Sequence, residues 1–98
     1  MTLSILITHY NRPDALLNCI KNIYDQNLDF PFEIIVSDDN SSTENLKKIE
    51  ALEQIKLIQS PMNTGLGANI NRGIKACSGN FILYFQEDFF INSNFKAY

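Results

Sequence analysis

Short apolar runs alternate along this chain with segments whose apolar residues recur at helical spacing, and this alternation limits the fold more than any other feature. The runs are LSILIT (3–8), FEIIVS (32–37), IKLIQ (55–59) and FILYFQ (81–86). Continuous apolar runs of this length suit strands that are covered on both faces. We therefore predict an α/β fold, with a Rossmann-like, open and mostly parallel sheet, helices on both faces and the strand order 3-2-1-4.

Three helices are expected between these strands. The first begins near Pro13, a residue suited to the first turn of a helix, and its apolar face carries Leu16, Cys19, Ile20, Ile23 and Tyr24. The second opens with Ser41 and Glu44, which are spaced as a capping box. The third starts near Leu66 and ends at Gly79, which we expect to be a left-handed cap.

Length and composition exclude several classes of function. A chain of 98 residues with 45% hydrophobic residues forms one core, so residues 1–98 are expected to be one domain or part of one. The net charge of −3 and the scattered basic residues argue against a nucleic-acid partner. The apolar runs are too short for a transmembrane segment, and we expect no signal peptide because the first residues lack its basic and apolar regions. We expect a cytoplasmic location.

Polar residues follow three of the four predicted strands, in the stretches THYNR, SDDNSS and QED. Because the carboxyl ends of parallel strands meet at one edge of a sheet, we expect one crevice there. Clustered carboxylates without a basic partner favour a divalent cation, Mg²⁺ or Mn²⁺, that keeps positions open for substrate phosphates. The same acids could instead solvate loops or cap helices. The residues expected at the crevice are Thr8, Tyr10, Asp38, Asp39, Glu87 and Asp88.

The basic and glycine residues near this edge suit a diphosphate. Arg12 and Arg72 are the cations that we place nearest to it, and Gly65 at a helix start would let backbone amides approach a phosphate. His9 is the only histidine. We interpret it as a loop residue and not as a general base, because the sequence shows no partner that would orient it.

The order of these motifs resembles the donor-binding half of family 2 glycosyltransferases. The stretches SILITHYNR, EIIVSDDNSS and NTGLGANINRGIKACSGNFILYFQED carry the resemblance over about residues 3–88. It implies an inverting enzyme with the A-type nucleotide-diphospho-sugar transferase fold, which binds a nucleotide-diphosphate sugar, most simply a UDP-sugar. The residues predicted to bind the nucleotide are Thr8, Tyr10, Arg12, Asp38, Asp39, Asn63, Gly65, Arg72 and Glu87.

The resemblance also assigns roles to single residues. Thr8 and Tyr10 correspond to residues that contact the base, and Asp39 to the acid that accepts a hydrogen bond from the uracil ring. Asp88 matches the last acid of the family's DxD motif, which holds Mn²⁺ or Mg²⁺ against the diphosphate. Gln86 replaces the first acid of that motif. The ribose contact then falls to Glu87 or Gln86, and the metal rests on Asp88 alone.

The family's fold continues past this stretch into segments that bind the acceptor and supply the catalytic base. We therefore expect a chain that is truncated at its C-terminus, has no catalytic base of its own and is inactive alone. Its acceptor is unknown, whether a saccharide, a lipid or a protein, and the full-length protein would be peripheral to the membrane. The apolar residues at the end of the chain should fold back or form a homo-oligomer contact: Phe89, Phe90, Ile91 and Phe95.

Two other functions fit part of the pattern. A dinucleotide-binding oxidoreductase domain also carries an acid after its second strand, but THYNRP replaces the glycine-rich turn that such domains need after the first. A non-catalytic magnesium-binding module of the receiver type would use the acids for the metal alone. Such a module places an acidic pair near the end of its first strand, where this sequence has none.

Overall fold

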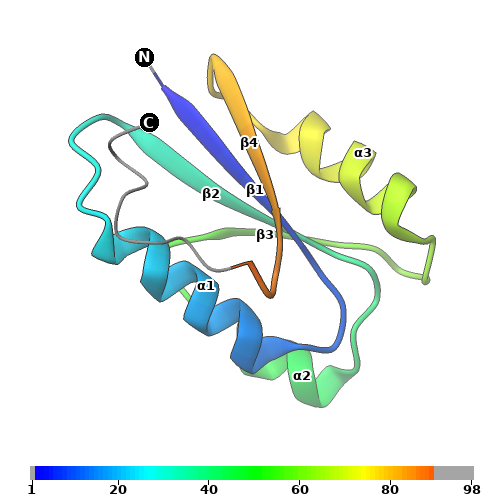
Figure 1. The fold of residues 1–98 in the computed structure, drawn as a ribbon. Coiled ribbons are helices and arrows are strands. Elements are labelled where there is room, and N and C mark those ends of the chain that lie inside the picture. The colour runs from blue at the N-terminus through cyan, green and yellow to red at the C-terminus, as the bar shows by residue number, and fades with distance from the viewer. Residues whose placement is uncertain (1, 90–98) are drawn as a thin grey trace.

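An all-parallel four-stranded sheet in the order β3-β2-β1-β4 organises the computed structural model, which describes residues 2–89 (Figure 1). The strands are β1 (Leu3–His9), β2 (Phe32–Asp38), β3 (Lys56–Gln59) and β4 (Phe81–Gln86). Both central strands are apolar and mostly buried, which is why they pair in the middle of the sheet. The predicted strand order is confirmed.

Three helices connect the described strands: α1 (Pro13–Asp25), α2 (Thr43–Lys47) and α3 (Leu66–Ala76). Alternate residues of a strand face opposite sides of the sheet, so β1 offers Ile5 to one face and Leu6 to the other. Ile5 belongs to a core cluster that includes the buried face of α1, whereas Leu6 lies against α3. Helices thus cover both faces, as the alternation in the sequence predicts.

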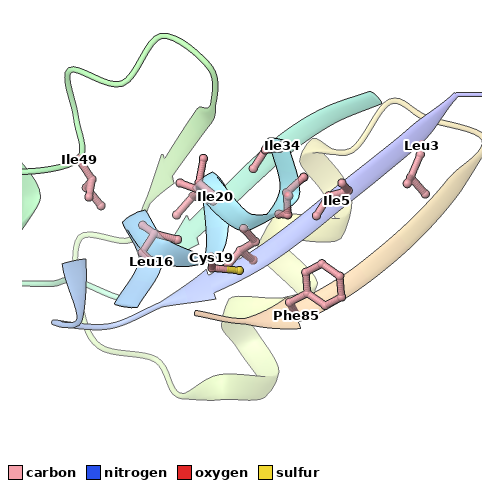
Figure 2. Close-up of a cluster of buried hydrophobic side chains, with 11 residues drawn as sticks. Leu3, Ile5, Leu16, Cys19, Ile20, Ile34, Ile49 and Phe85 are labelled. Atoms are coloured by element: carbon pink, nitrogen blue, oxygen red, sulfur yellow. The ribbon is translucent and has the colours of Figure 1, made fainter. Parts of the chain in front are cut away.

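The larger core lies between α1 and the sheet (Figure 2). Helix α1 brings the apolar face predicted from its spacing, and Phe85 joins the cluster from β4. Ile49, just after α2, is fully buried in the same cluster, which places α2 on the α1 side. The buried residues of the cluster are Leu3, Ile5, Ile7, Leu16, Cys19, Ile20, Ile23, Ile34, Val36, Ile49 and Phe85.

Helix α3 packs on the other face through small and polar residues. A Cβ added at Gly73 would overlap a methyl group of Leu6 and lie 3.1 Å from the Cβ of Ser37. The Ser37 hydroxyl donates to the side-chain oxygen of Asn69 at 2.7 Å, and the Asn69 amide donates back to the Ser37 carbonyl at 2.9 Å. These contacts hold the first half of α3 close to the end of β2.

Several local predictions differ from the structure. The N-cap of α2 is Ser42 and not Ser41, because the Ser42 side chain accepts the backbone N–H of Asn45 while the Ser41 hydroxyl is bonded to Asp38. Gly79 is not a left-handed cap; among the described glycines only Gly65 has a positive φ. A Cβ at Gly79 would lie 2.8 Å from the Ser4 backbone nitrogen, so close approach explains that glycine. No helix within residues 2–89 has the length and apolar content to cross a membrane.

Candidate nucleotide-binding site

The register of the sheet brings the polar ends of β1, β2 and β4 together. His9 lies opposite Asp38 in the β1–β2 pair, and Thr8 lies opposite Gln86 in the β1–β4 pair. A cavity of about 220 Å³ opens at this edge. Its lining comes from these strand ends and from the start of α3: Thr8, His9, Tyr10, Asp39, Asn63, Leu66, Asn69, Gln86 and Glu87.

Asp39 presents a nearly buried carboxylate to this cavity, with 5% of the residue exposed. Its Oδ1 accepts the backbone N–H and the hydroxyl of Thr64 at 2.9 and 2.7 Å, and its Oδ2 accepts the Gly65 N–H at 2.9 Å. Burial works against the charged form, but these hydrogen bonds hold the pKa of Asp39 below its ordinary value. The cavity therefore contains an anionic group that can only accept hydrogen bonds.

Arg72 approaches this carboxylate through Thr64. Its Nη2 donates to the Thr64 hydroxyl oxygen at 2.6 Å and lies 3.9 Å from Asp39 Oδ1. Its Nη1 donates to Asn69 Oδ1 at 2.8 Å. Arg72 thus reaches Asp39 through the Thr64 hydroxyl and is not among the lining residues.

Asp38 is completely buried, and both of its carboxylate oxygens are bonded. Oδ1 accepts from His9 Nδ1 at 2.7 Å and from the Ser41 hydroxyl at 2.6 Å, while Oδ2 accepts the Ser41 N–H at 2.9 Å. Burial opposes its ionisation, but the His9 and Ser41 hydrogen bonds hold the pKa of Asp38 below its ordinary value. The structure therefore places Asp38 beneath the site and not in the cavity.

The hydrogen bonds of His9 define its tautomer. The Arg12 backbone N–H donates to Nε2 at 3.1 Å, so Nε2 carries no proton and the ring hydrogen sits on Nδ1, directed at Asp38. Asp38 is the orienting partner that the sequence did not reveal. Because both ring nitrogens are engaged, His9 ties the loop after β1 to the end of β2. The prediction of a loop histidine is wrong, because His9 is the last residue of β1 and is buried in register with Asp38.

Thr8 and Tyr10 face the cavity from the end of β1. Thr8 is 2% exposed, and its hydroxyl shares a 2.8 Å hydrogen bond with the hydroxyl of Tyr84 on β4. Tyr10 is 47% exposed, so its ring is accessible for stacking on a planar ligand. A buried hydroxyl and an open aromatic ring thus stand on the same wall.

The acids after β4 lie on a turn that folds back on the strand. The Phe89 N–H bonds to the Gln86 carbonyl at 3.0 Å, and the Phe89 ring stacks on Phe85 with the ring centres 4.5 Å apart. Glu87 lines the cavity, and partial burial raises its pKa above the ordinary value. Phe89 therefore folds back onto Phe85, one of the two outcomes expected for it, although 47% of the residue remains exposed. Residues 90, 91 and 95 lie outside the described part.

Asp88 is exposed and pairs with Arg12, with 3.2 Å between Oδ2 and Nη1. Within residues 2–89, no three His, Cys, Asp or Glu side chains gather closely enough to hold a metal ion. A single exposed carboxylate fits a divalent cation only when the ligand's phosphate oxygens supply further positions, which is the usual way in which Mg²⁺ binds. The donor set thus fits a metal that arrives with a diphosphate.

The cavity gathers five of the nine residues predicted to bind the nucleotide: Thr8, Tyr10, Asp39, Asn63 and Glu87. The lining does not include the other four, Arg12, Asp38, Gly65 and Arg72, nor the predicted metal ligand Asp88.

Leu66 and Asn69 line the cavity but were not predicted to be site residues, and neither was His9, which was predicted to be a loop residue. The buried residues of α3 are Asn69 and Gly73, whereas Leu66 is 50% exposed. Apolar spacing therefore gave no signal for Asn69.

A family model described as glycosyl transferase family 2 matches residues 4–96. The chain is 36% identical over 92 residues to GalNAc(5)-diNAcBac-PP-undecaprenol beta-1,3-glucosyltransferase of Campylobacter jejuni, covering 88% of this chain and 29% of that protein. It is 31% identical over 99 residues to poly(ribitol-phosphate) beta-glucosyltransferase of Bacillus spizizenii, covering 95% and 16%. The chain thus spans less than a third of the length of these two relatives.

Solved structures show the same arrangement. S. aureus TarS in complex with UDP-GlcNAc superposes with a TM-score of 0.81 at 27% identity, covering 99% of this chain and 29% of that chain. TarS in complex with UDP gives 0.80 at 28%, covering 95% and 29%. A mannosyltransferase of Pyrobaculum calidifontis, at 18% identity and a TM-score of 0.78, covers 94% and 29% and shares the fold. With the fold, the cavity and the family match in agreement, this chain belongs to glycosyltransferase family 2.

Proposed function

We propose that this chain is the donor-binding part of an inverting glycosyltransferase and that its cavity binds the nucleotide of a UDP-sugar. The observation that carries the proposal is the carboxylate of Asp39, nearly buried and anionic at the carboxyl ends of the strands. The position agrees with the general location of ligand sites in open α/β sheets. The TarS complexes with UDP and UDP-GlcNAc support the choice of ligand.

The choice of base follows from hydrogen-bond counting. A carboxylate offers about four lone-pair positions. Thr64 and Gly65 occupy two on Oδ1 and one on Oδ2, so Oδ2 retains one position for a ligand. Because the Asp39 carboxylate only accepts hydrogen bonds, the ligand must offer it a hydrogen-bond donor. The ring N–H of uracil is such a donor, whereas the corresponding ring nitrogen of cytosine carries a lone pair and would face the carboxylate unfavourably.

The other predicted residues complete the nucleotide site in this proposal. Tyr10 stacks on the base with its exposed ring, and Thr8 contacts the base from the buried end of β1. Glu87, which lines the cavity from the turn after β4, lies on the ribose side. Arg12 pairs with Asp88 on the turn after β4, and we place it as the cation nearest to the diphosphate.

Asp88 would be the residue that holds a divalent cation, Mn²⁺ or Mg²⁺, together with the diphosphate of the ligand. When bound there, the ion neutralises the negative charge that develops on the departing diphosphate. Asp88 provides one exposed carboxylate on the turn after β4, where the Phe89 ring stacks on Phe85. Arg12 balances the charge of Asp88 in the structure without ligand.

The acceptor side is supplied by residues other than those of the cavity. His9 has both ring nitrogens bonded, so it holds the loop after β1 and does not take the proton of an acceptor hydroxyl. We further place the full-length protein in the cytoplasm at the membrane surface, because the name of the Campylobacter relative includes a lipid, undecaprenol.

A thermal-shift panel tests the proposal. UDP should raise the melting temperature more than CDP, GDP or ADP, and Mn²⁺ should increase the shift with UDP, because a ligand that binds only the folded state stabilises it. NAD serves as the control for a dinucleotide-binding domain. Failure of every diphosphate to shift the transition, or a larger shift with NAD, would contradict the proposal.

A further inference from the structure

Thr64 connects the carboxylate of Asp39 to the guanidinium of Arg72, and the direction of its hydrogen bonds is determined by chemistry. Arg72 can only donate, so the Thr64 hydroxyl oxygen accepts from Nη2 across 2.6 Å. The single hydroxyl hydrogen is then left for Asp39 Oδ1, 2.7 Å away. Arg72 thus donates to Thr64, and Thr64 donates to Asp39.

Arg72 is itself held from the side of the sheet. Its Nη1 donates to Asn69 Oδ1, and the Asn69 amide is bonded to the carbonyl of Ser37 at the end of β2. Asn69 is 2% exposed and Ser37 is fully buried. The guanidinium therefore has a defined position from which it can orient the Thr64 hydroxyl.

The hydroxyl also keeps the two charged groups apart. Arg72 Nη2 lies 3.9 Å from Asp39 Oδ1, beyond hydrogen-bond distance. If the hydroxyl were removed, Oδ1 would keep the Thr64 backbone N–H but lose one of its two hydrogen bonds, and Arg72 would be the charged donor nearest to the vacated lone pair. The carboxylate would then rotate towards the guanidinium to form a charge-assisted pair. That rotation would turn the remaining lone pair of Oδ2 away from the cavity.

We propose that Thr64 is a positioning residue that aims the Asp39 carboxylate at the ring N–H of the base and thereby determines the preference for uracil over cytosine. The inference rests on the proposed function of the cavity and deepens it. It assigns base specificity to a loop hydroxyl outside the cavity lining, acting through the acid that touches the ligand.

The test compares UDP and CDP binding by calorimetry for the wild type, Thr64→Val, Thr64→Ser and Thr43→Val. Valine preserves the shape of threonine but removes the hydroxyl, and serine restores the hydroxyl. Thr43 is an exposed threonine at the start of α2 and provides the matched control. The ratio of the two affinities is independent of the fraction of protein that is folded, because both ligands meet the same sample.

Thr64→Val should reduce the UDP-to-CDP affinity ratio roughly three- to tenfold, the range expected for loss of one hydrogen bond. Thr64→Ser and Thr43→Val should keep the ratio of the wild type. A wild type that discriminates, together with a Thr64→Val variant that discriminates equally, would overturn the role of Thr64 and leave the proposed function standing. A wild type that binds UDP and CDP equally would refute both.

Discussion

Two adjacent acids, Asp38 and Asp39, show at the scale of the residue what the sequence reveals and what it omits. Their position after a buried strand was sufficient to predict that both lie at the edge of the sheet where ligands bind. Ser41 bonds Asp38 from three residues away, but the other partners are distant in sequence: His9 bonds Asp38, whereas Thr64 and Gly65 bond Asp39. No local pattern predicts these distant pairings, because they form only when the segments meet in the folded chain.

Asp39→Asn should weaken UDP binding by roughly 1 to 3 kcal/mol, the range for disrupting a hydrogen bond to a charged group. The asparagine amide would also place a donor near the Gly65 N–H, which Oδ2 accepts in the wild type. Calorimetry measures the change, with Asp29→Asn, an exposed loop acid, as the control. Equal affinities of Asp39→Asn and the wild type would remove Asp39 from the site.

Asp88→Ala should abolish the gain in UDP affinity that Mn²⁺ provides while leaving metal-free binding almost unchanged. The reason is that Asp88 is the carboxylate that we assign to the metal, and its present partner, Arg12, remains available for the diphosphate. Titrations with UDP in the presence of Mn²⁺ or a chelator measure the gain. Glu87→Ala is the comparison; if that variant loses the gain and Asp88→Ala keeps it, the metal ligand is Glu87.

At the scale of the element, the four strands could be predicted well and the helix ends poorly. Strands β1 and β2 are long apolar runs whose burial outweighs local preferences. Helix α2 is only five residues long, although the apolar spacing in the sequence continues beyond it. The spacing continues because Ile49, in the turns that follow the helix, is also buried in the core. The close contact of α3 with the sheet at Gly73 was also not foreseen, since a glycine within a helix has no local signal for the side chain it will meet.

Gly73→Ala should destabilise the fold by about 1 to 3 kcal/mol, because the new methyl group would overlap Leu6 and push α3 from the sheet. Gly67→Ala is the matched control on the same helix, where an added Cβ meets nothing within 4 Å. It should be neutral or slightly stabilising, since alanine is the better helix former. Urea unfolding measures both. Equal stabilities of the two variants would contradict the packing described for α3.

At the scale of the whole molecule, the strand order explains why residues from distant parts of the chain form one site. Strands β2 and β3 lie on one side of β1, and β4 lies on the other. Because the strands are parallel, the residues after β1, β2 and β4 meet at a single edge of the sheet. The order could be predicted from the alternation of strands and helices together with the family resemblance. The cavity itself could not, because three of its nine lining residues, Asn63, Leu66 and Asn69, depend on where α3 begins and how closely it packs.

The central claim is that this edge binds the uridine diphosphate part of a sugar donor. The most direct measurement is a titration of the ¹⁵N-labelled chain with UDP, followed by amide chemical shifts. The account predicts the largest changes at Tyr10, Asp39, Thr64 and Gly65, with little change at Ser4, Ser78 and Gly79, which meet at the opposite end of the sheet. Saturable changes concentrated at that opposite end, or no saturable change at any amide, would contradict the account.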